Sequence, residues 1–252
     1  MSTTETLQQF AGTHLSYHRP AFPMPPYTYK NTKILVVSIR TTPEILRTLV
    51  PKPLEVNSEN LLQVYIGLFN IVEPIQLSYY EAGIIIPASH EGMEGSYMPV
   101  LYLDQTLPIT MGREVWGFPK FDAQVTLTEE SGTIRASVSS QATPLIKAEI
   151  RLAERENPPI VEAPTQVFLL KSIPSVQQNA SPDVKQLCTA MVRDQVYTEW
   201  HPGVATLTFD STMDDPLGAI PIVEKISGVY YTRDFVLDYG KVVYDYLTEP
   251  AV

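Results

Sequence analysis

The sequence predicts a mainly β fold, in which a closed, wrapped antiparallel sheet carries a few short helices. Segments dense in branched and aromatic residues recur along the chain, and 22 prolines punctuate it. Few stretches have a helical period, and strand after strand with few helices is typical of a barrel. No shift of composition marks a linker. We therefore expect one domain over residues 1–252, with residues 1–20 as a polar N-terminal arm.

The first half of the chain is expected to alternate strands with two short helices. Thr42 and Pro43 are typical of an N-cap and a first helical position, which predicts a helix over 44–49. A loop is expected at 91–95 and a second helix at 109–115. The expected strands are 34–39, 61–69, 77–87 and 98–103.

The second half is expected to consist of strands and turns. Ser131 and Gly132 indicate a hairpin turn, residues 175–183 are polar and exposed, and the segment 214–216 is a further turn. The expected strands are 121–128, 133–139, 145–152, 166–173, 187–196, 204–209, 220–231 and 242–246.

One lysine stands in an unusual setting, in the stretch G-R-E-V-W-G-F-P-K-F-D. Lys120 is flanked by Trp116, Phe118 and Phe121, which predict an apolar environment around its amine. Burial disfavours a charged amine, and a neutral amine can attack a carbonyl carbon to form a Schiff base. Lys120 is therefore the candidate nucleophile. The alternative is a strand-edge lysine that reaches water past its aromatic neighbours.

The G-R-E sequence followed by aromatic-Pro-Lys resembles the acetoacetate decarboxylase family, in which the lysine after the proline forms a Schiff base. The resemblance spans nearly the whole chain and implies a cone-like β-barrel with Lys120 inside. Further stretches that resemble the family occur in the right order: Phe22-Pro23 with Pro26-Tyr27, Val50 to Glu55, Tyr80 to Gly83, Tyr102 to Asp104, and Val243 to Leu247.

The chain also departs from the family pattern. The second lysine of the family falls at Phe121, its arginine at about Thr32, and one of its two glutamates near Tyr65 or Ile66. Glu81 matches the other glutamate, so the resemblance implies a catalytic role for it. A carboxylate inside an apolar run must be paired, hydrogen-bonded or functional.

The candidate site therefore has two sets of residues. Lys120 and Glu81 are the candidate catalytic residues. Arg113 is the nearest cation to Lys120 in sequence and could hold a substrate carboxylate, although a purely structural role is the alternative. The candidate substrate-binding residues are Arg113, Trp116, Phe118 and Phe121.

Composition limits the partners and the compartment. The formal net charge of −10 argues against nucleic acid and against an anionic membrane surface. The single cysteine, Cys188, and the lack of a signal peptide or a long apolar run predict a cytoplasmic protein. A homo-oligomer is expected from the family and from the aromatic residues of the N-terminal arm.

No motif indicates a cofactor or a metal. The four histidines, His14, His18, His90 and His201, lack metal-ligand spacing, and a lysine imine needs no cofactor. The leading hypothesis is a Schiff-base lyase that decarboxylates a small β-keto acid such as acetoacetate. Two alternatives stay open: aldol or dehydration chemistry on pyruvate-like oxo acids with the same lysine, and a non-catalytic barrel that binds a small ligand.

Overall fold

The structure is a computed structural model that describes residues 20–248. The predicted arm lies, apart from its last residue, outside the described residues. The helices are α2 (Pro43–Leu49), α3 (Thr106–Val115) and the short η1 (Leu217–Ala219). The strands are β1 (Tyr27–Arg40), β2 (Glu55–Val56), β3 (Leu61–Glu73), β4 (Leu77–His90), β5 (Met93–Tyr97), β6 (Leu101–Leu103), β7 (Lys120–Asp122), β8 (Gln124–Glu130), β9 (Thr133–Ser140), β10 (Thr143–Leu152), β11 (Thr165–Ile173), β12 (Val184–Phe209), β13 (Glu224–Asp238) and β14 (Val242–Asp245).

The mainly β prediction is confirmed, with local corrections; for example, the strand predicted at 220–231 is β13, Glu224–Asp238. Helix α2 begins as predicted, and the Thr42 side chain accepts a hydrogen bond from the amide of Ile45. The predicted loop at 91–95 is wrong, because Glu91 and Gly92 alone make the turn, both with positive φ, and β5 follows at once. The predicted break near residue 200 is also wrong, since β12 continues through it.

The strands form one sheet in the order β11-β5-β4-β3-β1-β13-β12-β10-β9-β8. The long strand β12 pairs with β13 along one edge, and β11 pairs with both β5 and β12. Most pairs are antiparallel, as expected. The pairs β11–β5 and β6–β7 are parallel, so a purely antiparallel sheet is not what the chain forms.

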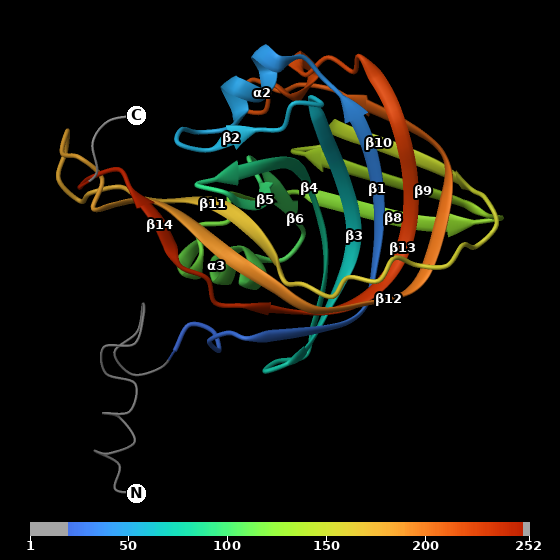
Figure 1. Ribbon diagram of the computed structural model, residues 1–252, viewed down its shortest axis with the longest axis horizontal. Helices are drawn as coiled ribbons and strands as arrows, with labels where there is room; N and C mark the ends of the chain where they lie inside the picture. Colours follow the sequence, from blue (N-terminus) through green and yellow to red (C-terminus); the bar gives the residue numbers. More distant parts are fainter. Residues whose placement is uncertain (1–19, 249–252) are drawn as a thin grey trace, which may run out of the picture.

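The central strands are buried on both faces, and each face contributes to a different core. On β1, Leu35 and Val37 belong to a core with residues of β9 and β10, whereas Ile34 and Val36 belong to a second core. Strands β8 and β10 cross behind β1 and β3 (Figure 1). The second core lies on the opposite face of β1, and it contains the candidate site.

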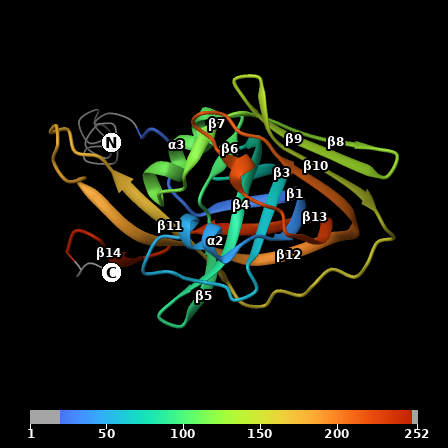
Figure 2. The same ribbon diagram turned by 90° about the horizontal axis from the view of Figure 1, so that it is seen from above.

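Helix α3 and two short strands lie together beside β4. Strand β6 pairs with β4 on one side and with β7 on the other, and α3 packs against β6 and β7 (Figure 2). In this register Leu103 is opposite Glu81 and Leu101 is opposite Lys120. The two candidate catalytic residues, 39 positions apart in sequence, therefore flank the same short strand.

Candidate active site

The end of α3 determines where Lys120 lies. The helix ends at Val115, and Gly117 takes a φ of +85°, which favours glycine. The amides of Gly117 and Phe118 both donate to the carbonyl of Gly112 at 3.1 Å. A Cβ at position 112 would lie 2.8 Å from Cδ and Cε of Lys120, so this glycine leaves room for the lysine side chain.

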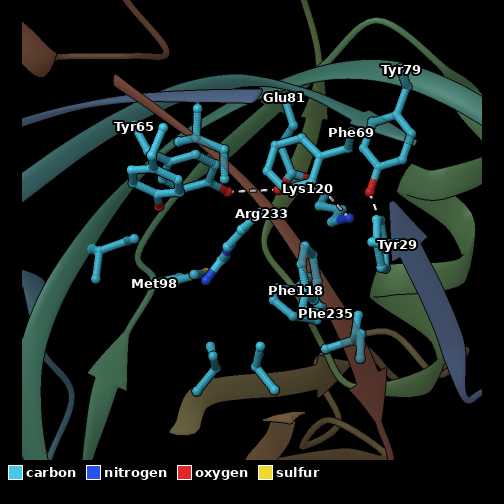
Figure 3. A pocket seen from close by; sticks show the side chains of 16 residues that line it. Tyr29, Tyr65, Phe69, Tyr79, Glu81, Met98, Phe118, Lys120, Arg233 and Phe235 are labelled. Atoms are coloured by element: carbon cyan, nitrogen blue, oxygen red, sulfur yellow. Dashed lines mark hydrogen bonds and ion pairs between the residues drawn. The ribbon is translucent and has the colours of Figure 1, made fainter. Parts of the chain in front are cut away.

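Lys120 and Glu81 form a buried ion pair. Each residue is only 6% exposed, and Lys120 Nζ lies 3.0 Å from Glu81 Oε2. The hydroxyl of Tyr65, on β3, donates to the other oxygen, Glu81 Oε1, at 2.7 Å (Figure 3). Glu81 Oε1 therefore accepts a hydrogen bond, whereas the buried Oε2 has the charge of Lys120 beside it but accepts no hydrogen bond.

Aromatic rings surround the amine. Lys120 Nζ lies 5.1 Å from the ring centre of Phe118 and 5.7 Å from that of Tyr79, distances at which a ring face attracts a cation. The hydroxyl groups of Tyr79 and Tyr29 are 3.1 Å apart. These groups enclose a cavity of about 80 Å³. Its apolar walls include Ile34, Phe69, Ile85, Met98, Val167 and Leu237.

The phenols of this cavity keep their protons. Burial raises the pKa of Tyr65 well above its ordinary value, and the neighbouring Glu81 carboxylate raises it further. Burial likewise raises the pKa of Tyr79. Tyr65 is therefore a hydrogen-bond donor to Glu81 across the working pH range and not an anion.

A third charged side chain, Arg233 on β13, lines the cavity. Its Nη1 donates to Gln195 Oε1 at 2.8 Å and to the Tyr197 hydroxyl at 3.4 Å, and its guanidinium lies 4.5 Å from the ring centre of Phe235. Its Nε is buried and has no hydrogen-bond partner. Among the described residues no ion pair includes Arg233.

Sequence reasoning missed Arg233. The only signal was a single cation in a strand rich in apolar and aromatic residues, Val229 to Leu237. Its neighbours Thr232 and Asp234 are polar, so the arginine is equally consistent with an outward-facing side chain. The cavity walls thus carry two cations, Lys120 and Arg233, and one anion, Glu81. The site has one net positive charge, although the chain as a whole is acidic.

Two of the predicted substrate-binding residues lie outside the cavity. Phe121 is 50% exposed, because successive residues of a strand point to opposite sides and Lys120 points inward. Arg113 is exposed as well; its Nη1 donates to the carbonyl of Lys120 at 3.3 Å, and its guanidinium is 6.0 Å from the Phe121 ring centre. Arg113 and Phe121 therefore do not line the cavity around Lys120, and their contact with substrate stays a prediction.

The other two predicted residues are buried near Lys120. Phe118 lines the cavity directly. Trp116 is 3% exposed and packs edge-on behind Phe118, with ring centres 5.8 Å apart, but it does not line the cavity. Trp116 thus supports the wall and makes no contact with the cavity interior.

The three positions at which the chain departs from the family pattern lie on β1, β3 and β7. Thr32, fully buried on β1, pairs with Arg233 on β13, so an arginine is present on the neighbouring strand. Tyr65 stands where the second glutamate is expected and donates to Glu81. Phe121 points away from the cavity, so a lysine at position 121 would not reach Lys120.

The described residues contain neither a metal-binding cluster nor a membrane-spanning helix. Within residues 20–248, no group of His, Cys, Asp and Glu side chains is placed to hold a metal ion. None of the helices in this part of the chain is both long and apolar enough to cross a bilayer.

The fold and the site define a mainly β protein with a lysine–carboxylate pair enclosed in an apolar cavity. The acetoacetate decarboxylase family model matches residues 14–247, and the chain belongs to this family. It is 34% identical over 241 residues to an acetoacetate decarboxylase of Bordetella avium (strain 197N), covering 91% of this chain and 93% of that protein.

Solved structures share the fold. The crystal structure of acetoacetate decarboxylase from Legionella pneumophila has a TM-score of 0.82 and 26% sequence identity, covering 96% of this chain and 97% of that one. The enduracididine biosynthesis enzyme MppR complexed with pyruvate has a TM-score of 0.77 at 18% identity, covering 90% of this chain and 93% of that one. At that identity the second likeness shows the fold alone.

Proposed function

We propose that this protein is a Schiff-base lyase that decarboxylates a small β-keto acid such as acetoacetate. The observation that carries the proposal is the buried pair of Lys120 and Glu81 in an apolar cavity, in a chain that is 34% identical to an acetoacetate decarboxylase. An amine so placed has a carboxylate at 3.0 Å that can take its proton and free it for attack on a carbonyl carbon.

The reaction runs through an imine on Lys120. The neutral amine adds to the ketone carbon, and the ketone oxygen takes one proton from the amine and one from protonated Glu81 and leaves as water, which gives an iminium ion. The bond to the carboxylate carbon then breaks, its electron pair moves into the iminium to form an enamine, and carbon dioxide departs. A proton adds to the enamine carbon, and water hydrolyses the resulting iminium to release the ketone and the free amine.

Glu81 carries out the proton transfers of this reaction, and Tyr65 supports Glu81. Glu81 accepts the proton of the Lys120 ammonium before attack and passes it to the departing ketone oxygen. It then takes up a proton from solvent and delivers it to the enamine carbon. Tyr65 holds Glu81 in place through the hydrogen bond of 2.7 Å. Tyr65 is thus a positioning residue, whereas Lys120 and Glu81 touch the reacting atoms.

The size and lining of the cavity favour a small substrate. At about 10–15 Å³ for each water-sized site, 80 Å³ holds roughly six water molecules, and a keto acid of a few carbons occupies similar room. The apolar walls suit its alkyl end. No cofactor is required, because the iminium itself accepts the electron pair.

Borohydride trapping tests the proposal. Incubation with acetoacetate and borohydride should add the reduced adduct to Lys120, as peptide mass spectrometry would show. Lys120→Ala should abolish the adduct and carbon dioxide release. Lys171→Ala is the matched control, because the Lys171 amine donates to the Val115 carbonyl at 3.1 Å and lies outside the cavity. Equal trapping in Lys120→Ala would reject this lysine as the nucleophile.

The second candidate keeps the imine and changes the reaction to aldol or dehydration chemistry on a pyruvate-like oxo acid. The uncharged residues Tyr65 and Ile66 favour it, because the family pattern has its second glutamate there and the site lacks that charge. Carbon dioxide release from acetoacetate, compared with condensation of pyruvate and an aldehyde, separates the two reactions. A binding protein without activity would form no trapped imine with either acid.

We further propose that the sheet closes into a barrel around the cavity, that the chain assembles into a homo-oligomer, and that it is cytoplasmic. The pairing of β11 with both β5 and β12 supports closure, because it joins the two sides of the strand order. Cys188, the one cysteine, is buried and unpaired, which suits a reducing compartment.

A further inference from the structure

We infer that Arg233 binds the substrate carboxylate and fixes the keto acid against Lys120. This inference rests on the proposed function. Arg233 comes from β13, and its side chain points into the cavity between Tyr65 and Phe118 (Figure 3). It replaces Arg113, the residue that the sequence indicated for this role, which lies outside the cavity.

The hydrogen bonds of Arg233 leave one edge of the guanidinium for a ligand. A guanidinium has five N–H donors in a planar fork, and Nη1 is the nitrogen that donates to Gln195 and Tyr197. The buried Nε has no partner. The edge formed by Nε and Nη2 matches the two oxygens of a carboxylate, which such an edge binds through two parallel hydrogen bonds.

The charges of the site require an anion as well. Lys120 and Glu81 neutralise each other at 3.0 Å, which leaves Arg233 as the uncompensated charge of the cavity walls. An arginine stays protonated in proteins, and its buried Nε is a donor without an acceptor, which is costly. A substrate carboxylate supplies the missing counterion and acceptor, and the aromatic rings within 6 Å of the guanidinium shield part of this half-buried side chain from water.

The chemistry of decarboxylation predicts which kinetic constant Arg233 controls. The substrate carries its negative charge on the carboxylate, and this charge moves into the imine as carbon dioxide leaves. The contact with Arg233 is therefore at least as strong in the bound substrate as in the transition state. Its loss should raise KM and should not lower kcat much.

The test compares acetoacetate with acetylacetone, a neutral β-diketone that forms an imine but has no carboxylate. Arg233→Met should raise KM for acetoacetate about 10- to 100-fold, as expected for loss of a hydrogen-bonded charge, and change kcat less than about threefold. The concentration of acetylacetone that half-saturates borohydride trapping should stay within about threefold of the wild-type value. Arg151→Met, which removes an exposed arginine of β10, is the matched control and should alter neither ligand.

A second variant covers the case in which Arg233→Met fails to fold. Gln195 Oε1 now accepts a hydrogen bond from Arg233 Nη1 at 2.8 Å. Gln195→Glu keeps the side-chain shape and places a carboxylate oxygen at this position. It neutralises the guanidinium, so KM for acetoacetate should again rise while acetylacetone is unaffected. Equal weakening of both ligands, or a large fall in kcat at constant KM, would overturn the inference.

A binding measurement keeps this inference separate from the proposed reaction. Butyrate should raise the melting temperature of the wild-type protein more than butyramide does, and Arg233→Met should abolish the difference without any imine chemistry. If butyrate protects through Arg233 but acetoacetate yields no adduct, the proposed reaction is wrong and the carboxylate site stands. If butyrate and butyramide act equally on the wild type, the carboxylate site is wrong.

Discussion

The proposed reaction depends on one buried carboxylate, Glu81, with a different neighbour at each oxygen. Lys120 is an ion-pair partner that must give up its proton, whereas Tyr65 is a neutral donor that keeps its own. Glu81 can therefore accept a proton from the amine while Tyr65 continues to hold it. Tyr79 lines the same cavity and bonds to Tyr29, not to a carboxylate.

Tyr65→Phe should lower kcat about tenfold while the fold is retained. The variant leaves one oxygen of a buried carboxylate without a donor, and a hydrogen bond to a charged group contributes about 1.5–3 kcal/mol. Steady-state decarboxylation kinetics measure the effect. Tyr79→Phe, which removes a phenol bonded only to another phenol, serves as the matched control and should change kcat less than about threefold. A similar fall in both variants would mean that Tyr65 does not position Glu81.

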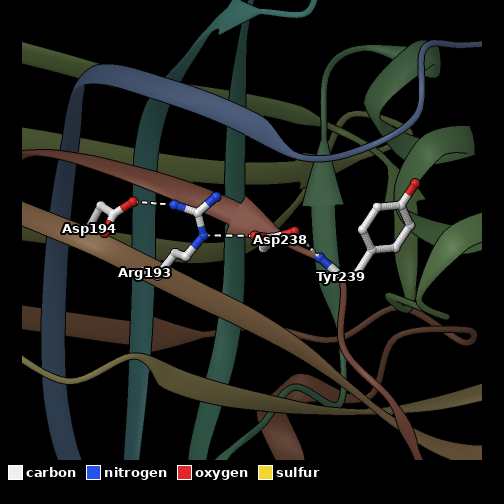
Figure 4. A network of polar contacts seen from close by, with 4 residues as sticks. All are labelled: Arg193, Asp194, Asp238 and Tyr239. Atoms are coloured by element: carbon white, nitrogen blue, oxygen red, sulfur yellow. Dashed lines mark hydrogen bonds and ion pairs between the residues drawn. The ribbon is translucent and has the colours of Figure 1, made fainter.

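At the scale of elements, a polar network joins β12 to β13 where their register shifts. The shift lies between Arg193 and Val196, and Asp194 has a φ of +53° there. Arg193 Nε donates to Asp238 Oδ2 at 2.7 Å, its Nη1 bonds to Asp194, and the amide of Tyr239 donates to Asp238 (Figure 4). Arg233 and Gln195 lie on these same two strands, so the network supports the strands that position Arg233.

Asp238→Asn should destabilise the protein in a pH-dependent way. The hydrogen bond from Arg193 lowers the pKa of Asp238 below its ordinary value of 3.8. A carboxyl group with a lowered folded-state pKa contributes stability above the unfolded-state value, and this stability is lost as pH falls through the folded-state value. The urea midpoint of the variant should therefore be below that of the wild type at pH 7.

The same experiment at low pH tests whether the loss of stability depends on the charge of Asp238. The two urea midpoints should approach each other as pH falls below 3.8 and through the lowered folded-state pKa of Asp238. Glu154→Gln removes an exposed carboxylate that forms no ion pair with the other described residues, and it is the control for a general charge effect. A difference between Asp238→Asn and wild type that stays constant from pH 7 to pH 3 would contradict the linkage to Asp238.

At the scale of the whole molecule, the sheet separates two apolar cores and places the cavity in only one of them. The core between β1 and β8–β10 contains aliphatic residues such as Leu35, Ile134 and Ile150, all nearly inaccessible. The other core is rich in aromatic residues and contains the cavity. A net positive cavity inside a chain of charge −10 draws a substrate anion locally, against the field of the surface.

The mass in solution should be at least twice the 28.2 kDa mass of the chain, as expected for a homo-oligomer. Large apolar side chains on β12 and β13 are exposed in the single chain, among them Val196, Val204 and Ile226, and their burial would favour association. Size-exclusion chromatography with light scattering measures the mass directly. A monomer at micromolar concentration would contradict the expectation.

The sequence by itself determined the mainly β class, most strand positions, the cap of α2, and the catalytic candidates Lys120 and Glu81. These features depend on local periods, on capping chemistry, and on a lysine and a carboxylate that stand out within apolar runs, so adjacent residues carry the information. The family resemblance depends on short motifs of the same kind.

Only the tertiary structure decided which side chains share the cavity. Arg113 is seven residues from Lys120 yet lies outside it, whereas Arg233 is 113 residues away and lines it. The direction of a strand side chain depends on register, and a shift of one residue reverses every side chain of the strand. Register here is set by long-range pairing of β1, β12 and β13 with their bulges, which no local pattern in the sequence encodes.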